Sequence, residues 1–212
     1  MSEQKNLLLE ILKMQEEMNA KIDPDWRNKQ YPWYRAVWTE CAELMDHHGW
    51  KWWKKQEPNW DQVRLELVDI WHFGMSMFLQ NFATAEDALS HLETPFNRPA
   101  AISEFTTLID RLVQSALSYR SFSVSAFKGL LHHAGMSLED LYKLYVGKNV
   151  LNSFRQDYGY KTGGYQKIWN GKEDNEVLML VLSRLDHNQC GYERRIYKEL
   201  ESAYIPVLRD KV

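Results

Sequence analysis

Two pairs of acidic residues have a spacing that could bind a metal ion. Glu40 and Glu43 are three residues apart, and Glu66 and Asp69 have the same separation. Residues three apart lie on one face of a helix, so two neighbouring helices could bring four carboxylates into a small volume. Like charges that close repel, and a divalent cation relieves the repulsion. Because carboxylate oxygens select hard cations, the quartet predicts a Mg²⁺ site.

Such a site could hydrolyse a nucleoside triphosphate. Two Mg²⁺ ions, or three when the substrate brings one, can hold both the attacking water and the leaving oxygen of a phosphoryl displacement. In this hypothesis Glu43 is the general base that takes a proton from that water. The alternative is that the acids form surface salt bridges, since an isolated E-x-x-E is common on solvated helices. Glu66 and Asp69 weigh against it, because they lie in the most apolar predicted helix, where a buried acid needs a partner.

An amide pair near the N-terminus could read a nucleobase. Gln15 and Asn19 are four residues apart and share a helix face. Their carboxamides offer a donor and an acceptor together, which matches the polar edge of uracil or of cytosine. Taken alone, the pair is more readily interpreted as two surface amides.

A basic segment could bind phosphate. Lys148, Asn152 and Arg155 recur at i, i+4 and i+7 and form one polar stripe, and further lysines follow at 161, 167 and 172. Arg grips phosphate with two hydrogen bonds and Lys acts as a point charge. A solvated basic face explains the pattern equally well. The paired histidines at 47–48 and 132–133 are interpreted as surface or core residues, and His72, three residues after Asp69, is left without a role.

The elements that must position these residues are helical. Apolar spacing and capping signals predict an all-α multi-helix bundle with a central four-helix metal-binding core. No segment alternates as a strand would. Residues 83–99, with Pro95 and Pro99, are expected to be mostly loop, and the glycines of 159–172 to form a flexible segment that closes over the substrate. The expected helices cover residues 3–20, 33–48, 60–82, 101–120, 123–134, 137–157, 173–186 and 191–203.

Composition restricts the class of protein. The 212 residues suit one domain, 1–212, and the net charge of −3 gives no reason to expect nucleic acid or an anionic membrane as a partner. Cys41 and Cys190 are too few for a disulfide framework, and Cys41 is interpreted as a buried thiol. Without a signal peptide or a spanning apolar run, the expectation is a soluble, cytoplasmic protein.

Three stretches of the chain resemble the dimeric all-α dUTPases, nearest their bacterial and phage members. The stretches are ECAELMDHHGWKWWKK (40–55), ELVDIWHF (66–73) and GKNVLNSFRQDYGY (147–160) with WNGKEDNE (169–176). The Gln15–Asn19 pair also fits the first motif of that family. The resemblance implies a Mg²⁺-dependent homodimer of the all-α nucleoside triphosphate pyrophosphatase superfamily that hydrolyses dUTP to dUMP and pyrophosphate. It leaves the use of dUDP open.

The resemblance also assigns residues. It implies Glu40, Glu43, Glu66 and Asp69 as metal ligands, Gln15 and Asn19 as uracil contacts and Trp53 as the tryptophan of the site. Its implied phosphate and sugar contacts are Lys54, Lys148, Asn152, Arg155, Tyr160, Lys167 and Asn175. Two alternatives remain: a related enzyme that prefers dCTP or accepts dCTP and dUTP alike, and a catalytically silent helical dimer that acts as a binding module.

Overall fold

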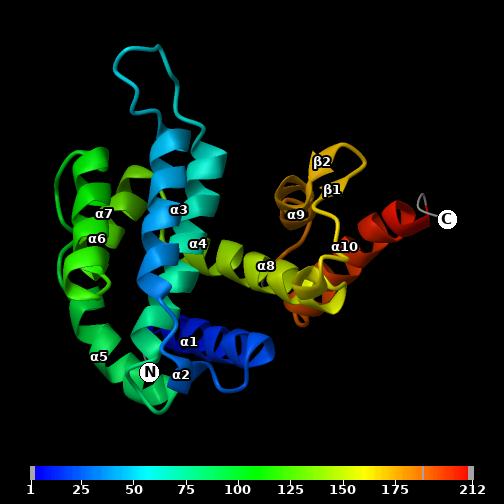
Figure 1. The fold of residues 1–212 in the computed structure, drawn as a ribbon, viewed down its shortest axis with the longest axis horizontal. Helices are drawn as coiled ribbons and strands as arrows, with labels where there is room; N and C mark the ends of the chain where they lie inside the picture. The colour runs from blue at the N-terminus through cyan, green and yellow to red at the C-terminus, as the bar shows by residue number, and fades with distance from the viewer. Residues whose placement is uncertain (1–2, 188, 210–212) are drawn as a thin grey trace. The chain divides into compact units, whose positions relative to one another are not determined.

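The computed structural model describes residues 3–187 and 189–209, and within these ranges the regular structure is helical apart from one two-stranded sheet (Figure 1). The all-α prediction is confirmed, whereas the metal-binding role of the core stays a prediction. The chain forms two compact units, one ending at Tyr142 and the other beginning at Lys143. The prediction of one domain over 1–212 is not tested by this division. The first unit holds α1 (Glu3–Ile22), α2 (Trp26–Lys29), α3 (Trp33–His48), α4 (Trp60–Leu79), α5 (Ala85–Asn97), α6 (Phe105–Tyr119) and α7 (Val124–His133).

Helix α8 (Leu138–Asp157) carries the chain into the second unit. There it is followed by a 3₁₀ turn (Tyr160–Thr162), strands β1 (Ile168–Trp169) and β2 (Lys172–Glu173), α9 (Asp174–Leu182) and α10 (Tyr192–Arg209). Aromatic side chains form much of this unit's core: Trp169 packs 4.9 Å from Tyr204 and 5.7 Å from Phe154, measured between ring centroids. No helix in the described ranges is long and apolar enough to cross a bilayer.

Helix α4 is the centre of the first unit. It packs along α3, and it also contacts α1 and α5. Its apolar residues point in all directions and most of them are buried, as expected for a helix that is apolar all round. Trp71 is fully buried and stacks on Phe127 of α7, with ring centroids 4.8 Å apart. The Asn59 side chain caps the start of α4 by accepting a hydrogen bond from the backbone N–H of Gln62. Polar residues on this helix are therefore held by a rigid, well-packed element.

The expectation of a loop over 83–99 is wrong, because helix α5 occupies Ala85–Asn97. Thr84 caps it by accepting a hydrogen bond from the N–H of Asp87. Pro95 lies in the last turn, where its missing N–H costs one hydrogen bond near a helix end. Leu89, Leu92 and Phe96 are buried, and this apolar face outweighs the proline. The short helix α2 was likewise not expected.

The expectation that no strand occurs is also wrong over a short stretch. Ile168–Trp169 pairs antiparallel with Lys172–Glu173 around Asn170 and Gly171. Both central residues have positive φ, 49° for Asn170 and 82° for Gly171, as a tight two-residue hairpin turn requires. An Asn-Gly pair is the strongest short signal for such a turn, and it was present in the sequence. The hairpin occupies the end of the segment 159–172 that was expected to close over substrate, and that closure stays a prediction.

Candidate functional site

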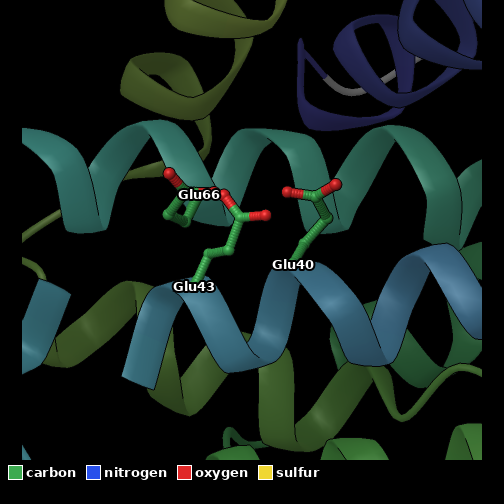
Figure 2. A group of neighbouring side chains, drawn as sticks. All are labelled: Glu40, Glu43 and Glu66. Atoms are coloured by element: carbon green, nitrogen blue, oxygen red, sulfur yellow. The ribbon is translucent and has the colours of Figure 1, made fainter. Parts of the chain in front are cut away.

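Three of the four predicted metal ligands lie together between α3 and α4. Glu40 and Glu43 of α3 and Glu66 of α4 each place a carboxylate oxygen within 4.8 Å of the others. Figure 2 shows the three side chains converging on the space between the two helices. Glu66 is only 7% exposed, Glu40 is half-buried and Glu43 is exposed. The i, i+3 spacing on α3 and the packing of α3 along α4 produce this convergence.

The chemistry of this acidic cluster fits a hard cation. Oxygen ligands lie about 2.0–2.6 Å from Mg²⁺ or Ca²⁺, so two ligands on opposite sides of one ion are about 4–5 Å apart. The 4.8 Å limit on the separations agrees with that span. Asp69, one turn further along α4, is half-buried, and among the described residues its oxygens lie outside this three-residue group. Its assignment as the fourth ligand stays a prediction, as does metal binding itself.

His47 is a neighbour of the acidic cluster that the sequence interpretation missed. Its Nε2 lies 3.5 Å from Oε1 of Glu66. With Thr39, Ala42, Glu43 and Asp46 it lines a cavity of about 410 Å³ on α3. The signal was available, because His47 follows Glu43 by four residues and Glu40 by seven, which places all three on one helix face.

The interpretation of Cys41 as an ordinary thiol agrees with its position. It lies between Glu40 and Glu43 in sequence but is fully buried in the core. Burial, together with the charge of Glu40, raises the pKa of the Cys41 thiol well above its usual value. A thiol held neutral in this way is a poor nucleophile and a poor metal ligand.

Gln15 and Asn19 lie inside the protein, so their interpretation as surface amides is wrong. Both face α4, with exposures of 5% and 2%. The Gln15 Nε2 donates to Asn19 Oδ1 at 3.0 Å and to Ser76 Oγ at 2.9 Å, while Gln15 Oε1 lies 2.7 Å from His72 Nδ1. Ser76 Oγ in turn lies 3.1 Å from Asn19 Oδ1. We call these four residues the amide network.

His72 and Ser76 were not assigned from the sequence, although a signal existed. Glu66, Asp69, His72 and Ser76 are spaced by three, three and four residues, so they follow one face of α4. That face is a continuous polar stripe on a buried helix. Its first half carries the acids, and its second half carries the hydrogen-bonding groups. One helix therefore supports both the acidic cluster and the amide network.

The basic stripe of α8 is also internal rather than solvated. Lys148 is 2% exposed, and its Nζ donates to Asn175 Oδ1 at 3.0 Å. Arg155 binds Asp174 through two parallel hydrogen bonds of 2.8 Å and also donates to Asn152 Oδ1 at 3.1 Å. The alternative of a solvated basic face is therefore wrong for these residues. Four of the predicted substrate contacts, Lys148, Asn152, Arg155 and Asn175, form one hydrogen-bonded group.

Asp174 is the centre of that group and was missed from the sequence. Burial would raise the pKa of its carboxyl, but the Arg155 guanidinium, the Tyr165 hydroxyl and the charge of Lys148 together hold this pKa below its usual value. Tyr165 donates to the same carboxylate at 2.7 Å. Tyr160 and Lys167 are exposed nearby, with Lys167 Nζ 5.8 Å from the centroid of the Tyr160 ring. Their roles as substrate contacts stay predictions.

Trp53 and Lys54 lie on the loop that joins α3 to α4. Trp53 is more than half exposed and meets Trp50 and Trp52 edge to face, at centroid distances of 5.3 and 5.5 Å. Lys54 is exposed. An indole and an ammonium on an exposed loop are accessible to a ligand.

Comparison with known proteins supports one family. A search of curated proteins finds no match. A family model described as dUTPase matches residues 7–160. That stretch includes both amides, the acidic cluster and the basic residues of α8 up to Tyr160, and it crosses the division between the two units. The chain therefore belongs to the all-α dUTPase family.

Proposed function

We propose that the protein is a Mg²⁺-dependent dUTP diphosphatase that hydrolyses dUTP to dUMP and pyrophosphate. This activity would supply dUMP and limit the incorporation of uracil into DNA. The observation that carries the proposal is the convergence of three carboxylates on α3 and α4, beside a buried amide network on the same α4 face. The family match supports the substrate class.

The spacing along α4 suits a nucleotide with a base at one end and phosphates at the other. Glu66 and Ser76 are ten residues apart, which is about 15 Å along a helix axis, whereas Asp69 and His72 are about 4.5 Å apart along it. A base held at the amide network could therefore extend its phosphates toward the acidic cluster. Polar groups arranged this way bind the two ends of one substrate and fix its direction.

Glu40, Glu43, Glu66 and Asp69 would hold two Mg²⁺ ions, or three when substrate brings one. Bound Mg²⁺ would supply charge neutralisation for the phosphates and would make the attacking water more acidic. We assign the role of general base to Glu43, because it is the exposed member of the acidic cluster and therefore the one most accessible to that water. The buried Glu66, beside His47, is better suited to a fixed ligand position.

Lys148, Arg155 and Lys167 would stabilise the negative charge that develops on the phosphates. Arg155 already makes a bidentate pair with Asp174, so phosphate would have to share this guanidinium with a protein carboxylate. Lys167 is exposed and is the most accessible of the three charges. We also propose that the two units act as one domain, that the segment 159–172 closes over bound substrate, and that the protein is a homodimer.

The test is a panel of nucleotides assayed for pyrophosphate release with and without Mg²⁺. We expect release from dUTP to exceed that from dCTP and dTTP and to stop with EDTA. Glu43→Gln should lower kcat by on the order of 10²–10⁴, while Glu193→Gln, an exposed acid at the start of α10, should change nothing. Near-normal turnover by E43Q would remove Glu43 as the base.

Two other outcomes have defined meanings. Equal kcat/KM for dCTP and dUTP would identify the related pyrophosphatase that accepts both. Absence of pyrophosphate release from every nucleotide would favour the catalytically silent dimer, and light scattering would then measure whether the dimer itself exists.

A further inference from the structure

His47 is held beside the acidic cluster by its backbone as well as by its place on α3. Its carbonyl oxygen accepts a hydrogen bond of 2.9 Å from the N–H of Asn59, the residue that caps the start of α4. The last turn of α3 is therefore joined directly to the start of α4, across the loop that connects the two helices. A side chain on a backbone fixed at this point has little freedom to leave its neighbours.

The His47 ring faces one member of the acidic cluster. Its Nε2 lies 3.5 Å from Oε1 of Glu66, and the Glu66 side chain is 10% exposed whereas that of His47 is 37% exposed. An imidazole with its proton on Nε2 is a donor, and a good N–H···O hydrogen bond spans about 2.7–3.2 Å. A movement of about 0.3 Å in either side chain makes that bond. A carboxylate has about four lone-pair sites, so Glu66 can accept from His47 and still bind a cation.

His47 contacts the ligand group from outside it. Either ring nitrogen could serve as a metal ligand, but among the described residues the ligand atoms that lie within 4.8 Å of one another come from Glu40, Glu43 and Glu66. A neighbour that hydrogen-bonds a ligand carboxylate in this way fixes its plane and so directs its remaining lone pairs. Loss of such a partner lowers metal affinity about 10–100-fold.

We propose that His47 is a positioning residue that orients the carboxylate of Glu66 for a small octahedral cation. This inference rests on the proposed function and deepens it. Mg²⁺ requires near-ideal octahedral geometry, whereas Ca²⁺ accepts about six to eight ligands in a flexible arrangement. A Glu66 carboxylate that is free to rotate therefore costs Mg²⁺ more affinity than Ca²⁺. His47 in this way contributes to the cation preference of the site without binding a cation itself.

The experiment measures cation binding to the full chain without nucleotide. Mn²⁺ is the probe, because it prefers octahedral oxygen ligands as Mg²⁺ does, and because the electron paramagnetic resonance signal of the free ion gives the fraction bound. Ca²⁺ is measured by competition with Mn²⁺. We expect His47→Phe to weaken Mn²⁺ binding by about 10–100-fold and Ca²⁺ binding by a smaller factor. His47→Gln keeps an N–H near the position of Nε2 and should recover most of the Mn²⁺ affinity.

His132→Phe is the matched control, because His132 is an exposed histidine in the last turn of α7, as His47 is in the last turn of α3. It should leave the affinity for both ions unchanged. An equal loss of Mn²⁺ and Ca²⁺ affinity in H47F, or no loss, would overturn the inference, because a structural defect acts on both divalent ions alike. Nitrogen hyperfine coupling to Mn²⁺ bound by the wild type, if absent in H47F, would also overturn it, because His47 would then be a ligand.

Folding and the proposed function are read separately from these affinities. If H47F does not fold, as judged by circular dichroism, the comparison of His47→Ala with H47Q decides, because both remove the ring and only Gln can donate. Full Mn²⁺ affinity in H47F, with pyrophosphate release from dUTP by the wild type, would overturn the inference and leave the proposed function standing. Absence of both Mn²⁺ binding and pyrophosphate release in the wild type would instead contradict the proposed function, and the inference with it.

Discussion

Replacing Arg155 should change both the stability of the second unit and its response to pH. In Arg155→Met a flexible apolar chain takes the place of the guanidinium that now makes two 2.8 Å hydrogen bonds to Asp174. The Asp174 side chain is 1% exposed, so water cannot take over the lost bonds. Removing one partner of a buried ion pair costs about 3–5 kcal/mol, because the remaining charge stays buried. We expect a loss of that size at pH 7.

The dependence of the free energy of unfolding on pH should change sign in R155M. In the wild type the pKa of Asp174 is lowered, so its contribution to stability is present above the unfolded value of about 3.9 and is lost as pH falls through the folded pKa. In R155M only the Tyr165 hydrogen bond and the charge of Lys148 would still oppose the effect of burial, so we expect the pKa of Asp174 to rise. The variant should then be most stable at low pH. Its free energy of unfolding should fall by about 1.4 kcal/mol for each pH unit between the unfolded pKa and the raised folded pKa.

The assay is urea unfolding of both proteins at pH 5 and pH 7, with hydrogen exchange on peptides from α8 and α9 to localise the effect. Asp174→Asn in the R155M background is the decisive control, because it removes the stranded charge. The double variant should be more stable than R155M at pH 7. An equal loss at both pH values, with no recovery in the double variant, would refute the argument from buried charge.

Three further predictions concern other parts of the first unit and the free thiols. Gly129→Ala should lower the free energy of unfolding by about 1–3 kcal/mol in a urea titration, because an added Cβ would lie 2.5 Å from the carbonyl oxygen of Ala101; a gain from the better helix propensity of alanine would contradict this. Lys128→Met should lower the free energy of unfolding by about 1–3 kcal/mol, because the ammonium donates to two backbone carbonyls at the end of α5. Thermal unfolding should show this loss as a lower melting temperature. With a thiol reagent at pH 8, the exposed Cys190 should react at once and the buried Cys41 only after urea is added, and two fast thiols would show that Cys41 is not buried in solution.

The sequence was sufficient for the elements that have regular spacing and clear ends. Helix α3 begins and ends at the predicted residues, and α4 is a buried helix capped at Asn59. The convergence of Glu40, Glu43 and Glu66 follows from helical spacing once the two helices are neighbours. Local signals determine such features, which is why they could be read without a structure.

Features that depend on distant partners could not be read in this way. No residue close to Arg155 in the sequence indicates that its guanidinium will bind the carboxylate of Asp174, 19 residues later. The burial of Gln15 and Asn19 depends on α1 packing against α4, and polar residues give no apolar pattern to predict it. Helix α5 was predicted as a loop for the opposite reason. The local signal of Pro95 was given more weight than the apolar helix face that packs in the core.

The polar stripe of α4 also restricts how this protein can change during evolution. Adding or deleting one residue between Asp69 and His72 would rotate one half of the stripe by about 100° relative to the other, since a helix turns once in about 3.6 residues. Either the acids or the amide network would then face the wrong side of the core. The loop from Gly49 to Asn59 has no such restriction, because its length does not alter the phase of either helix. Related proteins should therefore keep the number of residues between Asp69 and His72, and changes of function along this stripe should arise by substitution rather than by insertion or deletion.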